Sequence, residues 1–134
     1  MPENLFDLKI VCPDRVFFEG QASMIELNTT EGEVGIYKNH EPMTLIIAPG
    51  VCTITNGEEK KDAAVLAGFI EILPDKVTIL AETAEWPDEI DVERANSAKA
   101  RAEQRINAHS ADTDMARAQT ALSRSIARLY VAGK

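Results

Sequence analysis

Two kinds of hydrophobic pattern divide the chain. Up to about residue 85, short runs rich in Val, Ile, Leu, Thr and Phe alternate with Pro, Gly, Asn and Asp, and turns recur about every ten residues. Runs of β-branched and aromatic residues between turn residues are typical of a compact antiparallel sandwich or barrel. We therefore predict an N-terminal antiparallel β-sandwich. The expected strands are LKIVC, RVFFEG, MIELNTT, MTLIIA, VCTITN, AAVLAGFIEIL and KVTILA.

Two glycines mark expected turns between these strands. Gly57 follows VCTITN and suits the hairpin turn that would lead into the next strand. Gly50 follows Pro49, and a Pro-Gly pair favours a type II turn.

From about residue 90, apolar positions recur every three or four residues, which is the spacing of one helix face. The polar stretch NAHSADTD interrupts this pattern, and candidate N-cap aspartates stand before each run: Asp88 and Asp91, then Asp112 and Asp114. We therefore expect an αα-hairpin with a short connection. Alanines bury little area, about 0.8 kcal/mol per methyl-sized group, so the hairpin should be marginal alone and able to dock and undock. The expected seam is Val92, Ala95, Ala98, Ala102 and Ile106 against Met115, Ala118, Leu122, Ser125 and Leu129.

Composition sharpens the boundary between the two patterns. Residues 1–87 hold all six prolines and six of the seven glycines with a net charge of −9, whereas residues 88–134 hold eleven alanines and no proline with a net charge of +1. Such a shift predicts two domains, 1–87 and 88–134. The chain is globular in composition, with 45% hydrophobic and 27% charged residues. Its overall charge of −8 repels phosphate backbones, so we do not expect nucleic acid as a partner.

The two cysteines and the lack of a long apolar run limit the class further. Cys12 and Cys52 lie in expected strands without a CxxC spacing, so we expect reduced, buried thiols and no zinc site. The sequence has no signal peptide and no apolar run of membrane length. We expect a soluble protein that associates with a membrane only through a complex.

The segment EGEVGIYKNHEPM, residues 31–43, gathers three glutamates, a tyrosine and a histidine. One hypothesis is an enzyme that uses His40 with Glu31, Glu33 or Glu41 in acid/base catalysis. The other is a loop that contacts a partner. The chain has only two histidines, and neither has a Cys or Ser arranged beside it as a nucleophile pair, so the sequence disfavours catalysis.

Each expected helix also carries a stripe of arginines, because three arginines at offsets of seven and eleven residues fall within about 40° of one another. Asp91 and Asp114 stand three residues before the first arginine of each stripe, where local ion pairs are expected. The other four arginines have no acid one helical turn away, so the stripe is either a solvated surface or a site for phosphates or an acidic partner. The sequence lacks GxxxxGK[ST], which argues against a hydrolysing nucleotide site. The stripes are Arg94, Arg101 and Arg105, and Arg117, Arg124 and Arg128.

The order of these features resembles one family. EGEVGIYKNHEP precedes a Pro-Gly pair, then AGFIEIL and KVTILAETA, and an Ala-rich hairpin opens with IDVERA. In this order the whole chain resembles the epsilon subunits of bacterial rotary F-type ATP synthases. The resemblance implies a ten-strand sandwich followed by two helices. It also implies a non-catalytic subunit of the central rotor that couples ion flow to ATP synthesis, peripheral on the cytoplasmic face of the bacterial cell membrane.

The resemblance implies partners as well. One side of the sandwich would bind the gamma subunit, and one end would face the ring of c subunits. Glu33 and His40 match positions that approach the polar loops of that ring, in a loop at the ring-facing end. The hairpin would fold down on the sandwich, or extend along gamma, meet the alpha and beta subunits and inhibit ATP hydrolysis.

Some members of that family bind ATP on the folded-down hairpin, through Ile/Leu-Asp-x-x-Arg-Ala, a preceding glutamate and further arginines. The resemblance therefore implies ATP as a regulatory ligand, with no cofactor required and any magnesium dependence left open. The arginines would hold the phosphates, Asp91 and Arg94 would contact the adenine end, and Ala95 would leave room for the ring. A stand-alone ATP-binding sensor or adaptor module with an unrelated partner remains the alternative. The matching residues are Glu85, Ile90, Asp91, Arg94, Ala95, Arg101, Arg124 and Arg128.

Overall fold

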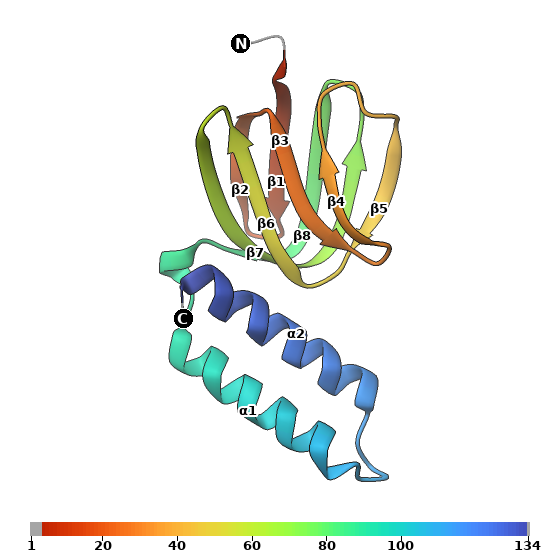
Figure 1. Cartoon of the computed structure of the whole chain (residues 1–134), viewed down its shortest axis with the longest axis vertical. Coiled ribbons are helices and arrows are strands. Elements are labelled where there is room, and N and C mark those ends of the chain that lie inside the picture. Colours follow the sequence, from red (N-terminus) through yellow and green to blue (C-terminus); the bar gives the residue numbers. More distant parts are fainter. Residues whose placement is uncertain (1–3, 134) are drawn as a thin grey trace.

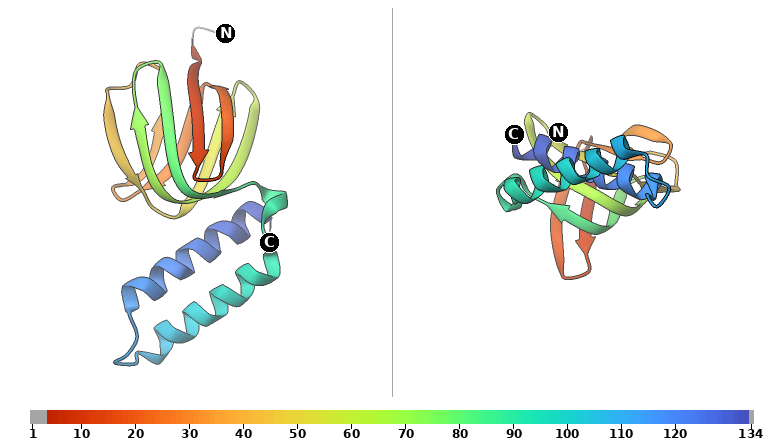
Figure 2. Two further views of the ribbon diagram at one scale, coloured as in Figure 1. Left: turned by 180° about the vertical axis from the view of Figure 1, so that it is seen from behind. Right: turned by 90° about the horizontal axis from the view of Figure 1, so that it is seen from below.

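The computed structural model describes residues 4–133 as a strand-rich half followed by two α-helices (Figure 1). Strands β3, β4 and β6 form one layer, β1, β2 and β8 lie behind it, and β5 and β7 link the layers. The helices lie side by side below one end of the sandwich, with α2 nearer to it (Figures 1 and 2). The expected class, an α+β fold with an N-terminal β-sandwich and a C-terminal αα-hairpin, is confirmed.

The strands form one eight-stranded sheet in the order β2-β1-β8-β7-β5-β3-β4, with β6 paired to both β3 and β7. Neighbouring strands are antiparallel except β1 and β8, which are parallel. This pairing places the first and last strands of the sandwich side by side. The bounds are β1 Phe6–Cys12, β2 Arg15–Ala22, β3 Met24–Thr29, β4 Gly32–Ile36, β5 Met43–Ile47, β6 Gly50–Asn56, β7 Glu59–Ile72 and β8 Lys76–Glu85.

The described residues contain eight strands, so the ten strands implied by the resemblance are a correction. The long strand β7, of 14 residues, pairs with β6 along its first part and with β5 along its last part. Strand β4 lies in a segment that the sequence predicts as a loop, because its glycines and glutamate are poor strand formers. A Cβ on its Gly35 would lie 2.8 Å from Met24 Cε, the end of a flexible side chain that would have to move aside.

The two turn glycines have different outcomes. Gly57 has φ +64° in the turn between β6 and β7, as the sequence predicts. Gly50 begins β6 and lacks the positive φ that a type II turn requires, so that prediction is wrong. A side chain at Gly50 is excluded instead by Asn28, whose Cβ lies 2.7 Å from the position of an added Cβ.

The main core fills the space between the layers. Along β1, Phe6, Leu8, Ile10 and Cys12 are buried and alternate with more exposed residues, which is the pattern of a strand with one face on the core. Cys12 and Cys52 are both free thiols in this core. Burial raises the pKa of both, that of Cys52 to about 12, so the thiols stay protonated.

The helices are α1, Val92–Ala108, and α2, Met115–Ala132. Their N-caps are Asp91 and Asp114, whose Oδ1 atoms accept the backbone N–H of the residue three positions on at 3.0 and 3.1 Å. No helix within residues 4–133 is long and apolar enough to cross a membrane. Every expected seam position is at least half-buried, and the fully buried ones are Ala95, Ala102, Ala118, Ser125 and Leu129.

Candidate functional site

The hairpin is docked on the sandwich through α2. The linker is the segment between β8 and α1, residues 86–91. Ala127 and Val131 of α2 pack with Ala64 and Leu66 of β7 and with Ile90 of this linker, in a small cluster separate from the main core. All five side chains are buried. The C-terminal end of α2 thus returns to the point where the chain leaves the sandwich, while the tip of the hairpin lies far from it (Figure 1). The docked state has its own apolar interface.

An ion pair crosses the same interface. Arg128 Nε donates to Glu85 Oε1 at 2.6 Å, and both side chains are about half-buried. Both residues belong to the expected ATP set, and the structure brings these two together. Arg128 has no acid one turn away on its own helix, and its partner lies 43 residues earlier at the end of β8. The pair links α2 to the sandwich in the docked state.

The other residues of the expected set lie along the hairpin and its linker. Ile90 and Ala95 are buried, so the methyl group of Ala95 is covered in this state. Arg94, Arg101 and Arg124 are exposed, and the ion pairs within residues 4–133 do not include them. These three guanidinium groups of the expected set are therefore available to an anion.

The local ion pairs predicted within each helix are wrong. The Asp91 and Asp114 carboxylates accept the backbone N–H groups of Arg94 and Arg117. Over the described part of the chain no ion pair joins these aspartates to the arginine side chains. Residues three apart at a helix start satisfy the first-turn N–H groups instead, which lack a partner inside the helix.

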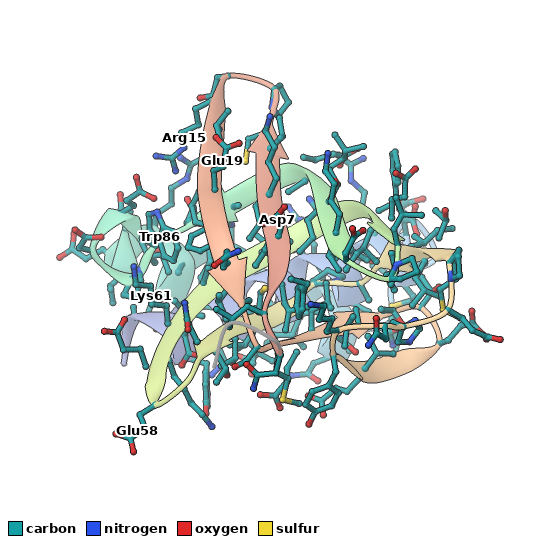
Figure 3. All side chains as sticks on the ribbon, turned by 90° about the horizontal axis from the view of Figure 1, so that it is seen from above. Asp7, Arg15, Glu19, Glu58, Lys61 and Trp86 are labelled. Carbon is teal, nitrogen blue, oxygen red and sulfur yellow. The ribbon has the colours of Figure 1, made fainter. Side chains whose placement is uncertain are left out.

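The linker between sandwich and hairpin is fastened to β2 by contacts that the sequence does not reveal. The Trp86 ring stacks on Phe17, with centroids 4.2 Å apart and an interplanar angle of 15°. Arg15 Nη1 and Nη2 each donate to a carboxylate oxygen of Glu89 at 2.8 Å. Figure 3 shows Arg15 and Trp86 on the same flank of β2. The short 3-10 helix η2, Pro87–Glu89, lies between these contacts.

The carboxylate of Glu89 is the most perturbed acid of the described chain. The hydrogen bonds from Arg15, and then the one from the Trp86 backbone N–H, lower its pKa from 4.5 to about 2. Sequence spacing could not find this pair because Arg15 and Glu89 are 74 residues apart.

Glu33 and His40 do not share one loop at one end of the sandwich, which corrects the expectation. Glu33 is the second residue of β4, and His40 lies in the connection after β4, at the other end of that strand (Figure 1). Glu33 lines a hollow of about 500 Å³ that Tyr130 of α2 also lines. His40 Nδ1 lies 2.8 Å from the backbone oxygen of Glu41. Their separation along β4 also weakens the hypothesis that Glu33 and His40 act together in catalysis.

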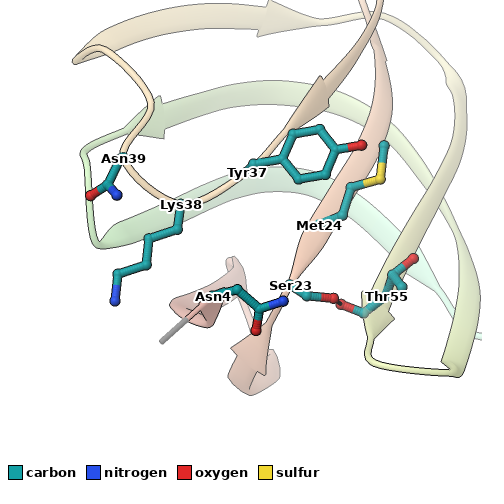
Figure 4. A pocket seen from close by; sticks show the side chains of 7 residues that line it. All are labelled: Asn4, Ser23, Met24, Tyr37, Lys38, Asn39 and Thr55. Atoms are coloured by element: carbon teal, nitrogen blue, oxygen red, sulfur yellow. Dashed lines mark hydrogen bonds between the residues drawn. The ribbon is translucent and has the colours of Figure 1, made fainter. Parts of the chain in front are cut away.

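The end of the sandwich near His40 carries a second hollow, of about 410 Å³ (Figure 4). Tyr37, Lys38 and Asn39 border it from the connection after β4. Ser23, in the bend between β2 and β3, and Thr55 of β6 also border it, and Ser23 Oγ donates to the Thr55 backbone oxygen at 3.1 Å.

An exposed apolar row crosses the outer face of the sheet. Ile46, Phe69 and Leu80 are cross-strand neighbours on β5, β7 and β8, with exposed fractions of 62%, 42% and 40%. The row continues through Val11 of β1 to Val16 of β2, which is 52% exposed. Large apolar side chains in one continuous row mark an interaction surface more often than a free one.

Both halves of the chain match known protein domains. Residues 5–87 match the family described as ATP synthase, Delta/Epsilon chain, beta-sandwich domain, and residues 88–133 match its long alpha-helix domain. An ATP synthase epsilon chain of Halalkalibacterium halodurans is 44% identical over 128 residues, covering 95% of this chain and 96% of that protein. One of Ruminiclostridium cellulolyticum is 40% identical over 124 residues, covering 92% of each.

Solved structures share the fold. A chain in the mitochondrial ATP synthase of Euglena gracilis, in an OSCP/F1/c-ring structure, superposes with a TM-score of 0.80 at 23% identity, covering 96% of this chain and 81% of that one. A chain in the central stalk/c-ring structure of Tetrahymena thermophila gives a TM-score of 0.61 at 15% identity, covering 95% and 96%. With both halves matched in order and relatives at about 40% identity over nearly their full length, the chain belongs to the ATP synthase delta/epsilon chain family.

Proposed function

We propose that this protein is a non-catalytic subunit of the central stalk of an F-type ATP synthase, which helps couple ion translocation to ATP synthesis. The observation that carries the proposal is the match of both domains, in order, to one subunit family over residues 5–133. The fold shared with chains of an F1/c-ring assembly and of a central stalk supports the same role. The protein would be peripheral, on the cytoplasmic face of a bacterial membrane, and held there by its complex.

The exposed apolar row is the surface proposed for the gamma subunit. Ile46, Phe69 and Leu80 are too exposed to serve the core, and burying them against a partner would recover about 25 cal/mol for each Å² removed from water. In contrast, the faces of β6 and β7 near the linker are already covered by α2.

The proposed contact with the c ring involves Glu33 and His40. Because they lie at opposite ends of β4, one partner surface can touch both only if it runs along that strand. Strand β4 ends the strand order of the sheet, so its outer edge is open to such a partner. Contact at the His40 end alone is the narrower form of the proposal.

Binding to gamma is tested by co-purification. Phe69→Asp places a charge in the middle of the apolar row and should abolish co-purification with gamma. Ile126→Asp is the matched control, because Ile126 is 49% exposed on α2 and lies outside the row. Wild-type protein that fails to purify with gamma would refute the stalk role and favour a stand-alone sensor.

The docked hairpin is proposed to bind ATP as a regulatory ligand. Arg101 and Arg124 are exposed and lack ion pairs within the described residues, as phosphate ligands require, and Arg94, expected at the adenine end, is exposed as well. Arg128 is held in place by Glu85 and has further N–H groups beyond the Nε that it donates. A ligand that binds only the docked form would shift the population toward it and relieve inhibition by an extended hairpin that meets the alpha and beta subunits.

Calorimetric titration of the protein with ATP, with and without magnesium, tests this site. Wild-type protein should show saturable binding, and Arg124→Ala should weaken it at least tenfold, because a charge-assisted contact to phosphate contributes about 1.5–3 kcal/mol. Arg117→Ala is the matched control: an exposed arginine of the same helix outside the proposed set. Equal affinity in wild type and Arg124→Ala would refute the site while leaving the stalk role intact.

A further inference from the structure

The linker lies against α2 through η2, but it also makes contacts with the sandwich that involve no residue of the docked helix. Four contacts fasten the linker to β2: two Arg15–Glu89 hydrogen bonds and the Trp86 ring against Phe17 and Phe18. Arg15 Nη2 also donates to the Ala84 backbone oxygen of β8 at 3.4 Å. None of them involves a residue of α1 or α2. We call this set the linker clasp.

The linker clasp also includes hydrogen bonds between residues of the linker itself. The Trp86 backbone N–H donates to Glu89 Oε1 at 2.9 Å, and the Glu89 N–H donates back to the Trp86 oxygen at 3.0 Å. The Arg15 guanidinium lies 5.0 Å from the centre of the Phe17 ring, so one charged group bridges the aromatic stack and the carboxylate. Charge-assisted bonds that share both carboxylate oxygens favour a single geometry.

The contacts of the linker change immediately after Glu89, from residues of the sandwich to residues of α2. Ile90 is buried with Ala127 and Val131, so its contacts depend on docked α2. Ile90 and Asp91 both have extended backbones, outside any helix, and the Ile90 N–H makes only a long bond of 3.4 Å to Pro87. Rotation at Ile90 and about the N–Cα bond of Asp91 breaks no hydrogen bond of α1, because Asp91 Oδ1 and the Asp91 backbone oxygen, which accept the Arg94 and Ala95 N–H groups, then move with the helix.

We infer that the linker clasp is a permanent part of the sandwich, and that the hairpin pivots at Ile90 and Asp91 when α2 leaves β7. This deepens the proposed function, since it rests on a hairpin that can undock. Undocking breaks the Ala127 and Val131 contacts and the Arg128–Glu85 pair, while Trp86 stays on Phe17. The clasp then fixes the point about which the hairpin swings, and so limits where its tip can reach.

Trp86 is the only tryptophan of the chain, so its emission reports directly on the clasp. The test uses the full chain with Val131→Asp, which places a charge in the docking interface. Hydrogen exchange of residues 92–133 should rise at least tenfold, while the Trp86 emission maximum and the exchange of residues 86–89 stay as in the wild type. Ile126→Asp adds the same charge at a 49% exposed position of α2 outside the docking cluster and should change neither readout.

A second pair of variants opens the clasp itself. Glu89→Gln should shift Trp86 emission to the red and increase its quenching by acrylamide, whereas Asp88→Asn, an exposed neighbour with no ion pair within the described residues, should not. Should Val131→Asp not fold, Arg128→Ala gives a milder undocking variant with the same expected readouts.

A red shift of Trp86 in the undocked variant as large as that of Glu89→Gln would overturn the inference, and so would unchanged emission in Glu89→Gln. Failure of the proposed function would give a different result. If the hairpin does not undock in the complex, hydrogen exchange of α2 in the wild-type protein assembled with gamma would equal that of the isolated, docked protein, whatever the Trp86 emission of the variants.

Discussion

At the residue scale, Gly68 decides the path of β7. It has φ +129°, next to irregularities in the pairing with β8 between Val65 and Gly68, and β7 changes partner from β6 to β5 there. A Cβ on Gly68 would lie 2.0 Å from the Leu80 backbone oxygen, and backbone cannot move aside as a flexible side chain can. This glycine therefore lets one strand serve both layers.

Gly68→Ala should lower the free energy of unfolding by roughly 3 kcal/mol or more, because strain at positive φ adds to a backbone clash. Gly57→Ala is the control: its φ is also positive, at +64°, but nothing lies within 4 Å of the added Cβ, so only about 1 kcal/mol is expected. Urea unfolding of both variants measures the difference. Equal losses would show that strain alone, without the clash, sets the cost at Gly68.

At the element scale, the linker clasp makes stability depend on pH. Glu89 has its pKa depressed from 4.5 to about 2 in the folded protein, so its contribution is full above about pH 4.5 and is lost as the pH falls toward 2. Because the side chain is 35% exposed, solvent screening limits this contribution to about 1 kcal/mol. The free energy of unfolding of wild type should exceed that of Glu89→Gln by this amount near neutral pH.

The difference between wild type and Glu89→Gln should shrink as the pH falls toward 2, where the carboxyl group is protonated in the unfolded chain and about half protonated in the folded one. Urea unfolding at several pH values measures it, and Asp88→Asn supplies the control without the pair. A difference that stayed constant down to that pH would mean that the Glu89 carboxylate does not sustain the clasp.

Elements that depend on local sequence were predictable, and those that depend on distant contacts were not. Asp91 and Asp114 cap their helices through neighbours three residues away, so the pattern narrowed each helix start to two candidate aspartates, of which the structure selects these over Asp88 and Asp112. Strand β4 is held by its neighbour β3 despite its two glycines, and the parallel pairing of β1 with β8 joins segments that no local pattern relates.

The same limit applies to the candidate site. The family motif pointed to Glu85 and Arg128 separately, but their contact depends on how α2 lies against the end of β8. Arg15 carries no signal at all in the sequence, since its role depends on a turn between β1 and β2 that lies beside the linker. Residue type and spacing predict which side chains a helix presents on one face. The docked arrangement determines which of those side chains already have an ion-pair partner.

At the scale of the whole molecule, two apolar clusters of unequal size imply unequal stability. The main core joins 20 buried residues of the sandwich, whereas the docking cluster has five, two of them alanines. The hairpin seam is also largely alanine, which buries little area per residue. The sandwich should therefore persist when the hairpin leaves, as a subunit with a mobile regulatory arm requires.

Truncation tests this asymmetry. A fragment of residues 1–90 keeps the main core and the linker clasp, and loses the cover over Ala64, Leu66 and Ile90 and the Arg128 partner of Glu85. We expect it to unfold cooperatively, with wild-type Trp86 emission and a melting temperature lower by roughly 5–10 °C, because partial exposure of Leu66 costs about 1–2 kcal/mol. A fragment of residues 1–85 lacks Trp86 and Glu89 as well, and should melt lower still.

Circular dichroism of residues 91–134 alone should show a weak, non-cooperative helix signal. An unfolded 1–90 fragment would contradict this account, because the sandwich would then depend on the hairpin and undocking could not occur without loss of the fold.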